Sequence, residues 1–438
     1  MKAHAGRGER RGLRELRVAA TGRPAPFRLT APAYALAVLG WIATAAVLTA
    51  ASDELARGAI SEEQPVLAAH LVGLVLFPFA VAAAAWQLLP VMLRNDPPTA
   101  RARPIALVLL AAGAPLAAAV ALEQDGLALL FAAVLAAGLV LLLAEFASLV
   151  RGAPAGRLLV VSRPAVLLAG AHAAIAFLLG VVAATGSGPE RLGVAYERFL
   201  LVHLSVALVG WLTILIAAVG RTLVPMLGLA PAATPRTRPV AEATVAAGLW
   251  LYVLGLAFES DAATVAGIVV MAAGIAPVAA RFARVARSGK IGPREGPVAH
   301  VAVGLLFLLE AAALGVGGAT GALDGRRAAI AAAVLLGLGW AAGVIVGHLG
   351  KLVSLSAWGS RPPGPRPSQL AFYPRRLWQV EVAVFAVAVE LVAVGVLLES
   401  SAVARSGGVL LLVAAAVAAA GVGETLRRAA VLERPSAP

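Results

Sequence analysis

Twelve apolar stretches, each long enough to cross a lipid bilayer as a helix, follow one another along this chain of 438 residues. A bilayer core about 30 Å thick takes roughly 20 apolar residues of helix, and lipid offers no hydrogen-bond partner to an exposed backbone. The sequence therefore predicts an all-α, polytopic integral membrane protein. The predicted spans are about 31–51, 65–92, 103–122, 127–150, 164–185, 199–227, 240–258, 263–280, 297–317, 328–356, 377–398 and 406–423.

The charged residues predict how the chain is oriented, because Lys and Arg near span ends stay in the cytoplasm. If the N-terminal tail is cytoplasmic, all but six of the 36 Lys and Arg fall on that side. The exceptions are Arg57, Arg191, Arg198, Arg326, Arg327 and Arg405. Acids fill the opposite loops: Asp53, Glu54, Glu62, Glu63, Glu123, Asp125, Glu259, Asp261, Asp324 and Glu399. We therefore expect a multi-pass protein of the plasma membrane with both termini cytoplasmic.

The spans also predict a domain organisation. Residues 1–30 form a basic cytoplasmic tail, 31–423 the membrane domain and 424–438 a short cytoplasmic tail. Spans two, six and ten share histidines or Gly-Trp pairs and are spaced by four, which predicts three pseudo-symmetric four-helix units. Their approximate limits are 31–150, 164–280 and 297–423.

Composition excludes several classes of function. The formal net charge is +13, but the basic residues are spread over every inner loop, which argues against nucleic acid as a partner. Anionic lipid headgroups at the inner face of the bilayer are the expected partners. The chain has no cysteine, so disulfides, thiolate metal sites and a cysteine nucleophile are excluded.

Three four-helix units whose second helices carry histidines resemble the catalytic subunit of the haem-copper oxidase superfamily. That superfamily includes oxygen reductases, nitric oxide reductases and NnrS-type nitric-oxide-response proteins. The resemblance rests on the motif that runs from His203 through Gly210-Trp211 to Arg221, and on His348, Lys351 and Trp358 at the end of span ten. It implies bound haem or copper, and membrane redox or assembly partners.

The chain also departs from the oxidases of that superfamily. They use paired histidines in span ten, a histidine pair near span seven, and in span six a histidine followed four residues later by tyrosine. Here His348 stands alone, span seven has no histidine and position 207 is Ala. We expect a divergent, non-oxidase relative without oxygen-reductase activity, and no catalytic residue is identified.

Depth in the bilayer decides which histidines can share a metal. His70 and His203 each lie about five residues below the outer face, roughly 8 Å at 1.5 Å per residue. A haem b or copper held by these two is the leading cofactor hypothesis. His348, another candidate metal ligand, lies some 20 Å lower. Arg221 and Lys351 are candidate contacts for a haem propionate. The alternative is that each histidine bonds a neighbouring helix and that both cations reach towards the inner interface.

Acids inside spans are costly and often mark proton paths. Glu310 and Glu390 lie about 13 residues into spans nine and eleven, at mid-bilayer, so we expect both to be proton-handling groups. The alternative is a neutral acid bonded to a backbone carbonyl. Three other acids lie near the inner edge, where an interfacial arginine is expected to pair with each: Glu145, Glu242 and Glu381, with Arg151, Arg238 or Arg376 as partners.

The sequence leaves three functional hypotheses. The first is a haem- or copper-binding membrane protein of a respiratory, nitric-oxide or metal-handling system. The second is a proton-coupled small-solute transporter or channel that uses Glu310 and Glu390. The third is an assembly or scaffold protein of the membrane.

Overall fold

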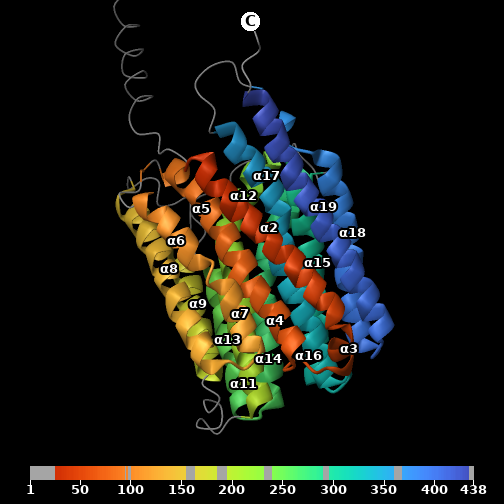
Figure 1. Ribbon diagram of the computed structural model, residues 1–438. Helices are drawn as coiled ribbons and strands as arrows, with labels where there is room; N and C mark the ends of the chain where they lie inside the picture. The colour runs from red at the N-terminus through yellow and green to blue at the C-terminus, as the bar shows by residue number, and fades with distance from the viewer. Residues whose placement is uncertain are drawn as a thin grey trace, which may run out of the picture.

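The computed structural model describes residues 25–93, 95–96, 100–153, 163–184, 195–230, 239–289, 295–359 and 367–433. These residues form helices and no strand, and twelve of their helical segments are long and apolar enough to cross a membrane. The helices run side by side in one bundle (Figure 1). The predicted all-α polytopic fold is confirmed.

Several spans are interrupted, so one span can carry more than one label. The spans are, in order, α2 (Phe27–Ala50); α4 (Glu63–Leu71), η1 (Val72–Leu76) and α5 (Phe77–Leu93); α6 (Arg103–Leu110) and α7 (Gly113–Ala121); α8 (Asp125–Arg151); α9 (Arg163–Ala184); α11 (Tyr196–Ser205), η4 (Val206–Thr213) and α12 (Ile214–Gly228); α13 (Val240–Ala257); α14 (Asp261–Ser288); α15 (Gly296–Ala319); α16 (Gly325–Val334), η5 (Leu335–Ala342) and α17 (Gly343–Gly359); α18 (Arg375–Leu397); and α19 (Ser401–Glu433). Short helices α3 (Ser52–Arg57), η2 (Ala100–Ala102) and η6 (Gln369–Ala371) lie between spans.

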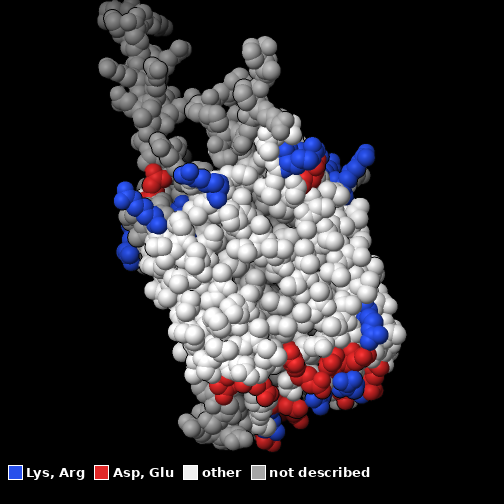
Figure 2. All heavy atoms as spheres, viewed as in Figure 1, with Lys and Arg blue, Asp and Glu red and all other residues white. Residues whose placement is uncertain are grey.

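Charged residues gather at the two ends of the bundle and leave an almost uncharged band between them (Figure 2). We call the end with Arg151, Arg287 and Arg375 the basic face, and the end with Glu123, Glu259 and Glu399 the acidic face. Because twelve spans are an even number, the described chain begins and ends on the same face, the basic one (Figure 1).

Span ten is the centre of the bundle. In its apolar 18-residue stretch 72% of the residues are buried, compared with 22% in span five. A stripe of glycines lets neighbouring rings approach its backbone, because a Cβ at any of these positions would clash with the ring it faces. The glycines and their rings are Gly339 with Phe307, Gly343 with Phe385, Gly347 with His300 and Gly350 with Trp378.

Two local features recur at every fourth span. The first is a π-helical turn, formed by η1, η4 and η5 in spans two, six and ten. The second is the tight turn that joins the third and fourth helices of each predicted unit. In all three turns a glutamate has a left-handed backbone, with φ near 55°: Glu123, Glu259 and Glu399. In each turn the residue after the glutamate donates its N–H to the carbonyl five residues before it, to Ala119, Gly255 and Gly395.

Several boundaries differ from the prediction: α2 begins at Phe27, α14 continues to Ser288 and α19 begins at Ser401. The last helix continues to Glu433, so residues 424–433 of the predicted tail are helical. The third span is divided at 111–112 because Pro115 has no N–H to donate to the carbonyl of Ala111. Residues 1–24 and 434–438 of the predicted tails lie outside the described residues.

Candidate functional site

Two histidines from separate predicted units face each other in the half of the bundle nearer the acidic face. The ring centres of His70 and His203 are 6.4 Å apart, and their planes differ by 17°. His70 is seven residues past Glu63, where its span begins. His203 is likewise seven residues past Tyr196, so both rings lie about 10 Å into the bundle. The corresponding position in span ten is Ala332, seven residues past Gly325.

The ring nitrogens distinguish His203 from the other described histidines. Four of them place Nδ1 at 2.6–2.9 Å from the carbonyl oxygen four residues earlier. These pairs are His70 with Val66, His172 with Leu168, His300 with Gly296 and His348 with Val344. Because a carbonyl only accepts, Nδ1 carries the proton in these rings. In His203 the buried Nδ1 has no partner at hydrogen-bond geometry, and the ring lies close to the backbone of Ala176 in span five.

The backbone beside the histidine pair keeps space free. Gly73 lies three residues after His70, on the same face of its helix, and nothing lies within 4 Å of where its Cβ would stand. On span five, a Cβ at Gly180 would lie 3.3 Å from Cε1 of His203. A small residue therefore borders the His203 ring, and open space adjoins the helix just after His70.

The other predicted cofactor residues lie elsewhere. Arg221 is 18 residues after His203, about 27 Å along the span. Its guanidinium donates to Glu242, with Nε 3.0 Å from Oε1. Lys351 is also near the basic face and is only 4% exposed, so it does not reach out to the interface. Its Nζ lies 2.9 Å from Oε2 of Glu295. Neither cation can contact a group bound between His70 and His203.

His348 and His172 do not join the pair either. His348 lies 23 residues past Gly325, where span ten begins, and so deep towards the basic face. His172 is bound within its own unit, where its Nε2 accepts from Nε1 of Trp250 at 3.1 Å. Among the described residues, no group of three or more His, Cys, Asp or Glu side chains can hold a metal ion.

The three acids near the basic face are buried, and among the described residues none of them pairs with an arginine that the sequence predicted as its partner. Glu145 accepts from Arg103, whose Nε lies 2.7 Å from Oε1. Glu242 accepts from Arg221. Glu381 lies against His300, with Oε2 2.9 Å from Nε2. Arg238, one of the expected partners, lies outside the described residues. The sequence gives no signal for these pairs, because each joins helices that only the tertiary fold brings together.

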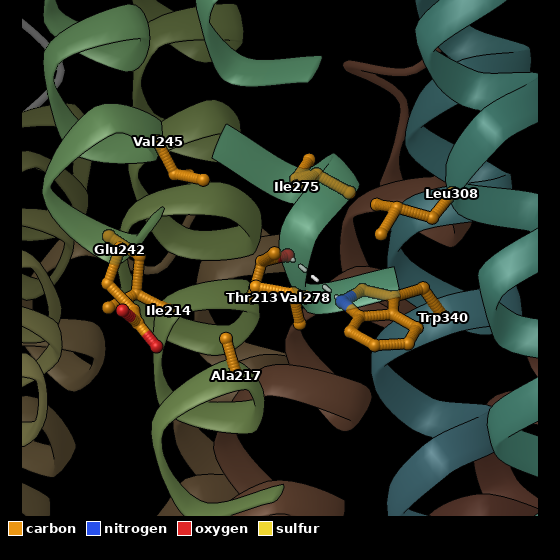
Figure 3. Close-up of a pocket in the computed structure, with 9 residues that line it drawn as sticks. All are labelled: Thr213, Ile214, Ala217, Glu242, Val245, Ile275, Val278, Leu308 and Trp340. Atoms are coloured by element: carbon orange, nitrogen blue, oxygen red, sulfur yellow. Dashed lines mark hydrogen bonds between the residues drawn. The ribbon is translucent and has the colours of Figure 1, made fainter. Parts of the chain in front are cut away.

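Glu242 lines a small internal cavity of about 10 Å³ (Figure 3). That volume holds about one water molecule, so no substrate fits there. On the far side of the cavity Nε1 of Trp340 donates to the hydroxyl of Thr213 at 3.1 Å. That hydroxyl in turn donates to the carbonyl of Leu208. The bond between Trp340 and Thr213 joins η5 of span ten to η4 of span six.

The carboxyl groups of Glu310 and Glu390 lie close to each other, across α15 and α18. A larger cavity of about 250 Å³ lies in the half nearer the acidic face, between spans six to ten. Its wall is apolar except for a few hydroxyl groups: Ser205, Thr213, Tyr252 and Thr264. Leu308 and Ala311, on either side of Glu310 in α15, line it.

Comparison with known proteins adds no assignment. No protein-family model matches the chain, and no curated protein is significantly similar to it. Membership of the haem-copper oxidase superfamily stays a prediction drawn from the sequence.

Replacing Arg221 with Met leaves the fully buried carboxylate of Glu242 without its cation. Breaking a buried pair in this way typically costs about 3–5 kcal/mol. We expect a large fall in the midpoint of thermal unfolding in detergent, and recovery of most of it in the Arg221→Met/Glu242→Leu double variant. The matched control is Glu259→Gln, which removes the exposed pair with Arg198. An effect of Arg221→Met no larger than that of the control would contradict this role.

Proposed function

We propose that this protein binds a haem b through His70 and His203 and serves a respiratory, nitric-oxide or metal-handling system of the membrane. The observation that carries the proposal is the approach of these two rings, one of which has a buried nitrogen without a partner. Oxygen-reductase activity is not part of the proposal, because the sequence lacks the further histidines that it needs.

Two imidazoles fit a haem better than a bare metal ion. A metal held by protein alone usually takes three or four ligands, whereas haem iron already has four ring nitrogens and needs only axial ligands. The rings of His70 and His203 lie at one depth with centres 6.4 Å apart, so these two residues would be the ones to hold a haem. Bound haem would supply one-electron chemistry.

Each surrounding residue has a distinct role in this proposal. The carbonyl of Val66 fixes the His70 ring and leaves Nε2 with a free lone pair. Gly180 leaves room beside the His203 ring. Arg198 lies on the same helix as His203, five residues or about 8 Å nearer the acidic face. In this proposal Arg198, and not Arg221, is the candidate contact for a haem propionate.

We propose that the protein lies in the plasma membrane with its basic face towards the cytoplasm, because loops rich in Lys and Arg are retained on the cytoplasmic side. Anionic lipid headgroups would then meet the exposed arginines of that face. The haem would lie in the opposite half of the bilayer, where a membrane redox partner could exchange electrons with it.

The absorption spectrum of the purified protein, expressed with ample haem, tests the proposal. We expect a Soret band, its loss in His70→Ala and in His203→Ala, and its retention in His172→Ala, whose ring bonds Trp250. A colourless protein that loses bound copper in the same two variants would assign copper instead. A wild-type protein without haem or copper would contradict the proposal, as would a Soret band that survives both substitutions.

The contact between Glu310 and Glu390 favours a second candidate, a proton-coupled small-solute transporter or channel. Two ionised carboxylates repel each other, so two carboxyl groups that lie close together within the membrane favour at least one proton on the pair. The 250 Å³ cavity, lined by Leu308 and Ala311 of the same helix as Glu310, would hold the solute. Proton release at the pair would then be coupled to movement of α15 against α18.

A lipid-soluble carbodiimide tests whether this pair holds a proton, since the reagent modifies protonated carboxyls from the membrane. We expect mass spectrometry to locate the adduct of dicyclohexylcarbodiimide on Glu310 or Glu390, and Glu390→Gln to reduce the labelling several-fold. Glu424, which pairs with Arg427 and Arg428 at the basic face, is the internal control and should stay unlabelled. Absence of label from both mid-membrane acids would contradict this candidate.

A further inference from the structure

Three of the buried carboxylates near the basic face belong one to each predicted unit, and their partners differ in one respect. Glu145 pairs with Arg103 and Glu242 with Arg221. Arginine does not lose its proton in proteins, so both pairs are permanently ionised. Glu381 pairs instead with His300, and histidine can bind or release a proton near neutral pH. Of the three pairs, this one can exchange a proton.

The geometry fixes how many protons the His300–Glu381 pair holds. Both side chains are 0% exposed, and Nε2 of His300 lies 2.9 Å from Oε2 of Glu381. Nδ1 already uses its proton on the carbonyl of Gly296, at 2.9 Å. A nitrogen lone pair and a carboxylate oxygen repel each other, so the close contact requires a second proton, on Nε2 or on Oε2. The contact between Nε2 and Oε2 does not have the angles of a full hydrogen bond. Neither oxygen of Glu381 has another hydrogen-bond partner.

Charged groups surround the pair on three sides. Glu295 precedes α15 and carries two cations, Lys351 of α17 at 2.9 Å and Arg375 of α18 at 3.4 Å. Nζ of Lys351 lies 4.4 Å from the centre of the Tyr373 ring. The Tyr373 hydroxyl accepts from the N–H of Gly296, the residue whose carbonyl holds His300. His348 of α17 also faces His300.

The cluster reaches the surface of the protein. The Arg375 side chain is 50% exposed at the basic face, whereas Glu295 behind it is 7% exposed. His300 lies four residues past the start of α15, about 6 Å inside that face. The ring fits there only because position 347 is glycine, since a Cβ would overlap it. The chain of polar groups thus runs from Arg375 inward to Glu381, and Phe385 packs on the inner side of the His300 ring.

We propose that His300 and Glu381 form a proton-exchange site that is loaded from the basic face of the membrane. In the unloaded form the imidazole is neutral and the carboxylate is charged. One proton from water adds to the pair and then moves between Nε2 and Oε2, and release reverses this step without electron transfer. Glu295, Lys351, Arg375 and Tyr373 position the pair and set its field. The site does not depend on the proposed haem.

Nitrogen NMR of the imidazoles tests the proposal on the otherwise unaltered full chain, reconstituted in lipid with ¹⁵N-labelled histidine. We expect one ring, assigned as His300 by its absence in His300→Gln, to change its ¹⁵N shifts with pH. The change should be lost in Glu381→Gln, and the shifts of the His172 ring, which is bonded to Trp250, should be the same in that variant as in the unaltered chain. A His300 ring that keeps one set of shifts at every pH the protein tolerates would overturn the proposal.

Infrared spectroscopy of oriented proteoliposomes provides a second readout, including the side of access. A pH step on the basic side should change the carboxyl band that is missing in Glu381→Gln, and the same step on the acidic side should not. Glu390→Gln is the control, because it removes a different protonated carboxyl and should leave the response intact. A Glu381 band that responds only from the acidic side, or to neither step, would overturn the assignment.

Discussion

Lipid supplies no hydrogen-bond partner, and this single constraint explains most of the polar structure of the protein. A buried ion without a partner would cost several kcal/mol, and each of Glu145, Glu242 and Glu381 lies against an arginine or a histidine from another helix. The same constraint makes unmatched groups informative. The orphan Nδ1 of His203 and the carboxylate of Glu381, both without a full hydrogen bond, are the features that mark candidate sites.

The two proposed sites lie at different depths and have different chemistry. The histidine pair is in the half nearer the acidic face and offers two neutral ring nitrogens, which suits a metal centre. The His300–Glu381 pair is near the basic face and is the proposed site of proton exchange. The carboxyls of Glu310 and Glu390 meet between these levels. Span ten contacts α15, α18 and the η4 turn of span six, so it is packed against helices that carry each of these groups.

The sequence predicts the large features of this fold because the bilayer imposes them on every span. Twelve apolar segments and the separation of acids from bases are visible without a structure, as is the equal depth of His70 and His203. The partners of Glu145, Glu242 and Glu381 were not predictable, since they depend on which helices become neighbours. The π-helical turns could not be predicted either. The residues of these turns are almost all apolar, so the sequence pattern does not show a change in helix period. One sequence signal of the repeat was missed. The turns around Glu123, Glu259 and Glu399 have similar sequences, which are Leu-Glu-Gln-Asp, Phe-Glu-Ser-Asp and Leu-Glu-Ser-Ser.

The approach of spans two and six at the two histidines is the claim on which the functional account rests. The chain has no cysteine, so a His70→Cys/His203→Cys variant offers a single pair of thiols to a short bifunctional reagent in native membranes. The account predicts an intramolecular cross-link in this variant and none in the control His70→Cys/His348→Cys, whose positions lie at opposite depths. Equal cross-linking of the two variants, or none between positions 70 and 203, would contradict it.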